Sequence, residues 1–346
     1  MRHNRIMVGH GELSACFEQF LAYRSPGKPS PHTARAFRQD FDAIASALAA
    51  ARGGKVDDLG AAEIDQERMC TAFGTYAETH APASIRRCWF SWNALCDYLF
   101  AQGRILENPM PRVSRPKVET TAPKPFDHVA VKCLVANLHQ PDEANARAWQ
   151  ERDLALVLTA LLTGCRLSEL VSLNVGDLRD LDSPGGSKEI RVHGKGKRQR
   201  ILIAEPSLVE VLTSYLASRV ERFPGALRTQ SGGASSTWQR LSPDAPLFVG
   251  HDGERITDST AQYRVKRAYQ RAGIDGQRTK GALVQQLRNT FATSLADADT
   301  NVDTLMRLLG LESVTTTQHY ARAAGKDARS KTTAIRIRHL ATSVVN

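Results

Sequence analysis

The chain has 346 residues, 42% of them hydrophobic, which suffices for two domains with separate cores and excludes a mainly disordered chain. Its 46 Lys and Arg outnumber 36 Asp and Glu, and the net charge of +10 favours a polyanionic partner. No apolar run approaches the ~18–20 residues that span a bilayer, and the N-terminus lacks the apolar core of a signal peptide. We therefore expect a cytoplasmic protein without a membrane partner.

The six cysteines form no CxxC pair, and no Cys/His cluster has the spacing of a zinc finger. We expect free thiols in a reducing compartment and no bound metal.

The first part of the chain predicts a small helical domain over residues 1–107. Apolar residues recur at helical spacing in four segments: 12–24, 32–50, 66–79 and 83–103. The last segment carries an aromatic stripe that includes Trp89 and Trp92. Such a stripe is more typical of a helix-bundle core than of a platform for stacking bases.

Residues 108–125 are predicted to link two domains, because five prolines between 107 and 125 exclude a regular helix or a central strand. The basic residues of this stretch either follow a DNA backbone or belong to an ordinary solvated linker, and the sequence leaves both readings open: Arg112, Arg115, Lys117 and Lys124.

Beyond Phe126 the pattern predicts a second, mainly helical domain over 126–325 with a small β-hairpin. An apolar helix ends at Gly164, an amphipathic segment covers 168–178, and two β-rich runs flank a Gly/Lys/Arg turn within 188–204. Further helices are predicted at 207–222, 259–272, 281–297, 303–309 and 315–324. Residues 223–245 are predicted to form a mobile loop, 246–250 a short strand, and 326–346 a weakly amphipathic tail.

Three segments hold residues suited to phosphodiester chemistry. They are TGCRLSEL (163–170), GKGKRQR (194–200), and QQLRNTFATSL (285–295), which LLGLESVTTTQHYAR (308–322) follows. Paired metal-binding carboxylates and a GxxxxGK[ST] loop are not evident, so arginines remain as the natural phosphate clamps. Taken singly, each segment also fits a surface arginine, a solvated turn or a packed tyrosine.

In this order and spacing, the segments resemble the tyrosine recombinase (phage integrase) family. The resemblance covers nearly the whole chain: residues 1–107 resemble the helical core-binding domain, the following stretch the linker of Xer-like members, and the rest the mixed α/β catalytic domain. The pieces TGxRxSEL, VxGKG, LRxTFAT and LLG…TTQxY are highly specific in combination.

The resemblance assigns roles residue by residue. Arg166 and Arg288 match the two arginines that clamp the phosphate, and Glu169 matches the acidic residue that orients the first. Lys195 matches the general acid toward the leaving 5′ oxygen, with Lys197 as a neighbour that is not excluded. Tyr320 matches the nucleophile that forms a 3′-phosphotyrosyl intermediate. The resemblance implies no cofactor.

Two positions depart from the family pattern. Gln285 stands where the family usually has histidine, and Leu311 where it has histidine or tryptophan. Glutamine can donate a hydrogen bond to phosphate but cannot shuttle a proton, and leucine can do neither. Asn289 replaces a further, less critical histidine. His319 offers a substitute base, although a surface histidine is the more ordinary reading.

The resemblance leaves two functions open. One is a site-specific recombinase for integration, excision or transposition of a mobile element, which acts on double-stranded DNA with specific core sites as a homotetramer or with companion recombinases. The other is a catalytically weak or inactive DNA-binding partner. A type IB topoisomerase is less favoured, because of the Xer-like linker. Predicted DNA contacts are Arg86, Arg87, Arg115, Lys117, Lys197, Arg198 and Arg200. The tail docks on a neighbouring protomer or on its own chain.

Overall fold

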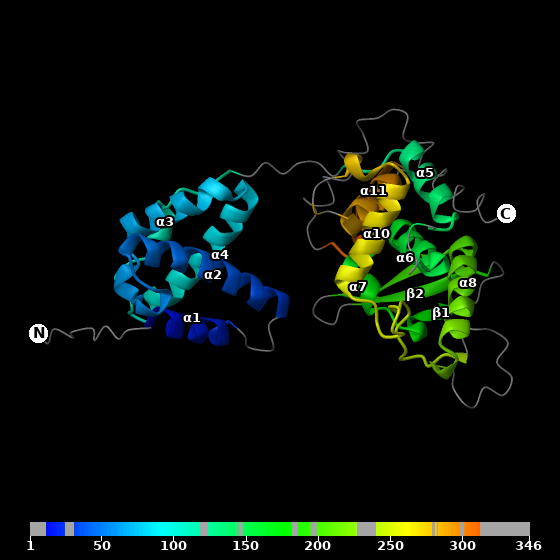
Figure 1. Cartoon of the computed structure of the whole chain (residues 1–346), viewed down its shortest axis with the longest axis horizontal. Coiled ribbons are helices and arrows are strands. Elements are labelled where there is room, and N and C mark those ends of the chain that lie inside the picture. Colours follow the sequence, from blue (N-terminus) through cyan, green and yellow to red (C-terminus); the bar gives the residue numbers. More distant parts are fainter. Residues whose placement is uncertain are drawn as a thin grey trace, which may run out of the picture. The chain divides into compact units, whose positions relative to one another are not determined.

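The computed structural model describes residues 12–24, 31–117, 124–142, 144, 148–181, 186–194, 199–226, 240–278, 281, 283–297 and 301–311. The chain divides into two compact units, Met1–Thr120 and Thr121–Asn346 (Figure 1). Within the described ranges, every helix is too short or too polar to cross a membrane.

The first unit is a bundle of four helices, as the sequence predicted: α1 (Glu12–Tyr23), α2 (Pro31–Arg52), α3 (Gln66–Thr79) and α4 (Pro82–Ala101). Short 3-10 turns lie at Val56–Asp58, Ala61–Glu63 and Met110–Arg112. Aromatic rings bind the helices together, since Phe41 of α2 stacks on Phe17 at 4.1 Å and on Trp92 at 5.5 Å between centroids. The aromatic stripe of α4 is therefore core: Trp89 and Trp92 are both buried.

The stretch after α4 continues to pack against the first unit. Met110 and Val113 are buried in its core, and the indole Nε1 of Trp89 donates to the carbonyl of Val113 at 3.1 Å. The two apolar side chains between the prolines explain this attachment, since each removes hydrophobic surface from water. Residues 110–113, predicted as part of the linker, thus belong to the packing of the first unit.

The second unit combines helices with one small sheet. Its helices are α5 (His128–Leu138), α6 (Gln150–Thr163), α7 (Leu167–Ser172), α8 (Pro206–Arg222), α10 (Asp258–Arg271), α11 (Leu283–Asp297) and α12 (Val302–Leu309). Its strands are β1 (Leu178–Asp180), β2 (Lys188–His193) and β3 (Gln199–Ala204), and 3-10 turns lie at Val175–Asp177, Pro224–Ala226 and Asp275–Gln277.

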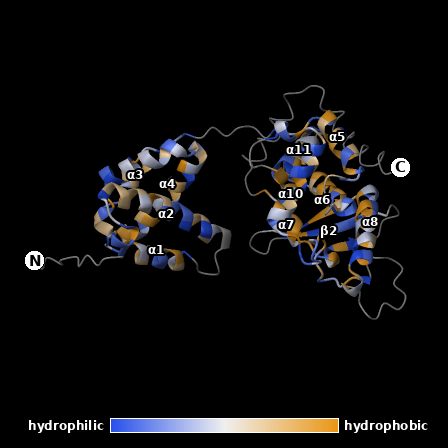
Figure 2. Ribbon diagram, viewed as in Figure 1, coloured by the Kyte–Doolittle hydropathy of each residue, from blue (hydrophilic) through white to orange (hydrophobic). Residues whose placement is uncertain are grey.

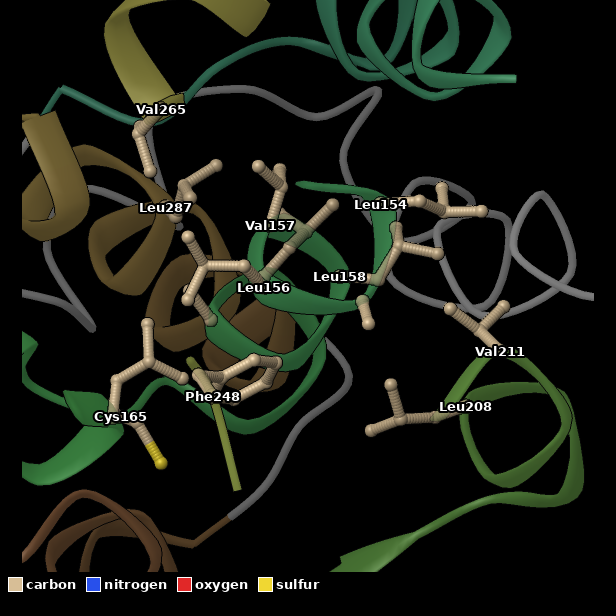
Figure 3. Close-up of a cluster of buried hydrophobic side chains, with 14 of the residues drawn as sticks. Leu154, Leu156, Val157, Leu158, Cys165, Leu208, Val211, Phe248, Val265 and Leu287 are labelled. Carbon is tan, nitrogen blue, oxygen red and sulfur yellow. The ribbon is translucent and has the colours of Figure 1, made fainter. Parts of the chain in front are cut away.

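Helix α6 lies at the centre of the second core, in contact with α5, α7, α8, α10, α11 and β3. Figure 3 shows Leu156 and Leu158 of α6 among Leu208 of α8, Val265 of α10 and Leu287 of α11. A helix surrounded on most sides must be apolar around most of its circumference, which accounts for the strongly apolar sequence of α6. The surrounding helices instead alternate hydrophobic and hydrophilic residues (Figure 2).

The three strands form an antiparallel sheet in the order β1-β2-β3. The predicted hairpin is confirmed: Lys188 pairs with Ala204 and His193 with Gln199, while residues 195–198 of its turn lie outside the described residues. The predicted fold class, mainly helical with a small sheet, is likewise confirmed. Strand β1 was not predicted and pairs with β2 through Leu178 and Ile190.

Two local predictions differ from the structure. Residues 246–250 form no ladder strand, but make only the isolated bridges Asn174↔Pro246 and Val249↔Arg255. The amphipathic segment 168–178 stays helical only to Ser172, because the N–H of Asn174 donates to Asp177 Oδ2 at 2.8 Å and begins a 3-10 turn. The helix predicted at 315–324, the tail 326–346 and most of the loop 223–245 lie outside the described residues.

Candidate active site

Arg166 owes its position to the glycine that ends α6. Gly164 adopts φ +63°, a left-handed conformation that favours glycine, and its N–H donates to the carbonyl of Ala160. A Cβ at this position would lie 2.4 Å from Cδ1 of Phe291, so the space also requires glycine. The chain then turns, and Arg166 becomes the residue that precedes α7.

Glu169 orients Arg166 through both its backbone and its side chain. The N–H of Arg166 donates to Glu169 Oε2 at 2.7 Å, and its Nη1 donates to Oε1 at 2.9 Å. This arrangement satisfies a backbone donor at the start of α7 and also fixes the guanidinium. The Arg166 side chain nevertheless stays 41% exposed, whereas that of Glu169 is 4% exposed.

Glu169 also accepts two bonds from Arg200, on β3. Arg200 Nη1 donates to Oε1 and Nη2 to Oε2, each at 2.7 Å. Burial alone would raise the pKa of Glu169, but hydrogen bonds from Arg200 and Arg166 outweigh it and hold the pKa at about 2. The carboxylate is therefore ionised near neutral pH.

Arg288 reaches the same place from α11. It is 2% exposed, its Nη1 donates to the carbonyl of Gly164 at 2.6 Å, and its Nη2 donates to the carbonyl of Leu309 at 2.5 Å. One side chain thus joins the end of α6 to the end of α12. The sequence placed Arg166 and Arg288 in one site, and the structure brings their guanidinium groups to the same helix end.

The C-terminal end of α12 gathers all three arginines. The last carbonyls of a helix lack intrahelical partners and carry partial negative charge, so they attract guanidinium donors. Three consecutive carbonyls each accept one bond here: Leu308 from Arg200 at 2.9 Å, Leu309 from Arg288 at 2.5 Å, and Gly310 from Arg166 at 2.9 Å.

Gly310 leaves room for this cluster. It has φ +59°, and a Cβ built on it would lie 3.2 Å from Nη1 of Arg200 and 3.6 Å from Nη1 of Arg166. A Cβ would therefore crowd the guanidinium of Arg200, touch that of Arg166 at an ordinary contact distance, and strain the backbone.

The two positions that depart from the family pattern lie nearby. Gln285, one turn before Arg288 on α11, is exposed, and its Nε2 donates to Oδ1 of Asn289 at 3.0 Å. Leu311 is half-buried, packs on the small cluster that contains Leu305 and Leu309, and donates its N–H to the carbonyl of Met306. Neither residue presents a group that moves a proton.

Arg200 was predicted to contact DNA, and the structure gives it a different setting. Its side chain is 11% exposed and is engaged by Glu169 and the Leu308 carbonyl. Strand periodicity gave no signal for this, because both faces of β3 are apolar: Arg200 shares one face with the buried Leu202 and Ala204, while Ile201 and Ile203 on the other face are exposed. The predicted residues Lys195, Lys197, Arg198 and Tyr320 lie outside the described residues.

The first unit holds the remaining predicted DNA contacts. An open groove of about 960 Å³ runs beside α2 and α4 and is lined by Arg24, Arg86, Arg87 and Phe90, among others. Arg87 pairs with the buried Asp40 at 2.7 Å and stays 52% exposed.

The neighbouring arginines of the first unit are held by rings and carbonyls. Arg86 donates to the carbonyl of Pro116 at 3.3 Å, and the guanidinium of Arg115 lies 4.8 Å from the ring centre of Trp89. Arg115 and Lys117 are both exposed.

The chain is similar to known proteins over most of its length. The model of the phage integrase family matches residues 127–326. The tyrosine recombinase XerC of Azotobacter vinelandii is 29% identical over 311 residues, which cover 89% of this chain and 91% of that protein. XerC of Caldanaerobacter subterraneus subsp. tengcongensis is 25% identical over 330 residues, which cover 90% of this chain and 84% of that protein.

Two solved structures share the fold. XerH site-specific recombinase bound to palindromic difH substrate superposes with a TM-score of 0.66 at 16% identity, covering 94% of this chain and 96% of that one. A lambda integrase dimer bound to a COC′ core site gives 0.61 at 15% identity, covering 91% of this chain and 78% of that one. The family model spans more than half of the chain, so the resemblance read from its motifs is confirmed, and the chain belongs to the phage integrase family.

Proposed function

We propose that this protein is a site-specific DNA recombinase that cuts and rejoins DNA through Tyr320. The phenolate oxygen of Tyr320, its proton lost to solvent, attacks a backbone phosphorus. The new O–P bond joins the tyrosine to the 3′ end of the cut strand, and the bond between the phosphorus and the 5′ oxygen breaks. Lys195 gives a proton to that oxygen, which leaves as a 5′ hydroxyl. Attack by a 5′ hydroxyl reverses the step and releases the tyrosine, so rejoining needs no ATP. The roles of Tyr320 and Lys195 rest on the sequence motifs alone.

One observation carries the proposal: Arg166 and Arg288 converge from different helices at the end of α12. Two fixed guanidinium groups suit a phosphate whose charge grows as the attacking oxygen arrives. Arg166 is the more accessible, so we assign it the first contact with the phosphate. The chain then continues from α12 toward Tyr320, the proposed nucleophile.

We assign duplex binding in the first unit to the groove beside α2 and α4. Arg24, Arg86 and Arg87 line it, and Arg115 and Lys117 are exposed on the following stretch. Exposed arginines contact phosphates without reading sequence, so they fix register on the duplex. Phe90, 47% exposed, adds an apolar contact.

We further propose that the active assembly is a homotetramer over two core sites, or a complex with companion recombinases. A lambda integrase tetramer bound to a Holliday junction shares the fold, with a TM-score of 0.59 at 14% identity. The altered residues 285 and 311, together with the Gly/Ser-rich loop 223–245, favour a mobile-element enzyme over a housekeeping one.

A catalytically weak or inactive DNA-binding partner is the second candidate. Gln285 is turned to Asn289, and Leu311 packs in an apolar cluster, so neither the usual histidine position nor the usual histidine or tryptophan position holds a group that can shuttle a proton. Loss of one oxyanion donor typically slows a reaction by about 10²–10³. This candidate predicts specific DNA binding without a covalent product.

The deciding experiment traps the covalent intermediate. Duplexes that the full chain binds are first selected from a random pool and then rebuilt as nicked suicide substrates. Wild type should give a protein–DNA adduct that survives denaturing electrophoresis, and Tyr320→Phe should give none. The matched control Tyr263→Phe alters a 50%-exposed tyrosine on α10 and should keep the adduct. Absence of the adduct from wild type, with binding intact, would instead support the inactive partner.

A further inference from the structure

Arg200 extends from the β-sheet and bonds both to Glu169 and to α12. It leaves β3 on the buried face, beside Leu202, and both of its Nη atoms bond to Glu169. Its Nε donates to the carbonyl of Leu308 near the end of α12. Nε and both Nη atoms of Arg200 are thus all bonded to protein groups, and we take its role to be to hold those groups together.

The sharing of Glu169 explains why a second arginine is useful. Oε1 accepts from Nη1 of both arginines, while Oε2 accepts from the backbone N–H of Arg166 and from Nη2 of Arg200. Arg200 thereby neutralises the carboxylate with a two-pronged pair. Arg166 gives it one side-chain bond and keeps a 41% exposed side chain for a substrate.

Removal of Arg200 would change both charge and geometry. Glu169 would then have Arg166 as its remaining guanidinium partner, and a buried carboxylate draws such a partner into a closer, two-pronged pair. The guanidinium of Arg166 would then be bound by Glu169 and would be less available to a phosphate. At the same time β3 would lose its bond to α12, the helix that precedes the segment with Tyr320.

We infer that Arg200 is a positioning residue: it neutralises Glu169 so that Arg166 stays available to the scissile phosphate, and it fastens the hairpin that bears Lys195 to the end of α12. The inference rests on the proposed function. Arg200 does not touch DNA in this scheme, unlike the prediction from the sequence.

The test measures affinity and chemistry separately with Arg200→Met in the full chain. We expect the single-turnover rate of adduct formation at saturating DNA to fall about 10²-fold, while the dissociation constant for the same duplex changes less than about threefold. The matched control Arg179→Met removes an exposed arginine of β1 and should leave the rate unchanged.

Two further variants separate a positioning role from a merely structural one. Arg200→Lys keeps the charge but cannot form the two-pronged pair, so we expect partial rescue, to within about tenfold of the wild-type rate. Glu169→Gln/Arg200→Met removes the unpaired carboxylate and should fold even if Arg200→Met does not; its rate should exceed that of the single variant.

The outcomes that overturn the inference are distinct. An Arg200→Met protein that reacts at the wild-type rate shows that Arg200 positions nothing. Uniformly weaker DNA binding, with the salt dependence of log affinity reduced by about one, marks a phosphate contact instead. A wild type that binds DNA without an adduct refutes the proposed function, and then hydrogen exchange decides the inference. Faster exchange in the last turn of α12 in Arg200→Met supports the bond to Leu308, and unchanged exchange refutes it.

Discussion

Each unit of this protein contains a buried carboxylate that an arginine approaches, yet the two carboxylates serve different ends. Asp40 in the first unit is 1% exposed and accepts from Arg87 and from the hydroxyl of Ser91, both at 2.7 Å. Those partners lie on α4, so the carboxylate fastens α2 to one neighbouring helix. Glu169 in the second unit accepts from two arginines and a backbone N–H.

The two carboxylates differ in the number and exposure of their arginine partners, and this difference explains how Arg166 is held for a substrate. Asp40 has one charged partner, which is 52% exposed, and its role ends with the packing of two helices. Glu169 has one partner whose side chain is 11% exposed and another whose side chain is 41% exposed. A carboxylate satisfied by the first can hold the second in place without consuming its charge. The same kind of ion pair thus joins two helices in the first unit and positions Arg166 in the second.

The largest effect should come from Glu169→Ala. It leaves Arg200, whose side chain is 11% exposed, without its counter-charge, and loss of a partner from a buried pair typically costs about 3–5 kcal/mol. We expect the second unit to lose that much free energy of unfolding in urea titrations, and adduct formation to disappear. Asp40→Ala is the matched change, and it should destabilise the first unit while the chemical step at saturating DNA stays near wild type. Equal loss of the chemical step in both variants would erase the distinction.

Gly164→Ala should have the next largest effect. The added Cβ would lie 2.4 Å from Phe291, at φ +63°. We expect a loss of about 2–4 kcal/mol from the clash and the backbone strain together. The carbonyl that Arg288 bonds would also shift, so the adduct rate should fall. Gly186→Ala, at φ +69° but with open space, is the control and should show the smaller, backbone part alone. Identical losses in the two variants would contradict the steric account.

Acid should weaken the support at Glu169 in a defined direction. Its pKa lies at about 2 in the folded chain, below the ordinary 4.5, so its contribution to stability is full above pH 4.5 and is lost as the pH falls toward 2. The difference in free energy of unfolding between wild type and Glu169→Gln, measured by urea titration, should therefore be smaller at about pH 3.5 than at about pH 6. Glu221→Gln, an exposed change on α8, is the matched control for the substitution of Glu by Gln. A Glu169→Gln difference that widens in acid would refute the assignment.

Arg87→Gln should have the smallest effect on folding. Arg87 is 52% exposed, but its partner Asp40 is 1% exposed and would keep only the Ser91 hydroxyl among these two side-chain donors, so we expect a loss of about 1–3 kcal/mol in the free energy of unfolding. If the groove beside α2 and α4 binds DNA, affinity should fall by about three- to tenfold for every sequence, with a weaker salt dependence. Filter binding at several salt concentrations measures both quantities. Unchanged affinity would remove Arg87 from the interface.

Most helices were predictable because an amphipathic or apolar pattern of many residues defines each of them. Gln66–Thr79 was predicted with the bounds that the structure shows, and α8 and α10 differ by one residue at the ends. Strand β1 escaped because three residues carry no periodicity of their own, and it exists only through pairing with β2. Residues 246–250 have strand-like composition but find no continuous partner.

The candidate site was predictable in Arg166, Glu169 and Arg288, but not in Arg200 or in the backbone acceptors of the arginines. Arg166, Glu169 and Arg288 follow from motifs, and the structure brings them together. The carbonyls of α12 that hold them are backbone atoms, which every residue carries and no letter of the sequence marks. Arg200 was predicted to contact DNA from its basic, turn-like surroundings, and its pairing with Glu169 was not foreseen because both faces of its strand are apolar.

Gly310 has a practical consequence for anyone who screens substitutions across this chain. It has no side chain, yet a Cβ there would meet the guanidinium groups of Arg200 and Arg166. In a saturation library scored for recombination, we expect position 310 to tolerate as few replacements as the arginines themselves. A map drawn from such scores would mark Gly310 as reactive, although what the library detects there is a left-handed backbone conformation and the close approach of Arg200.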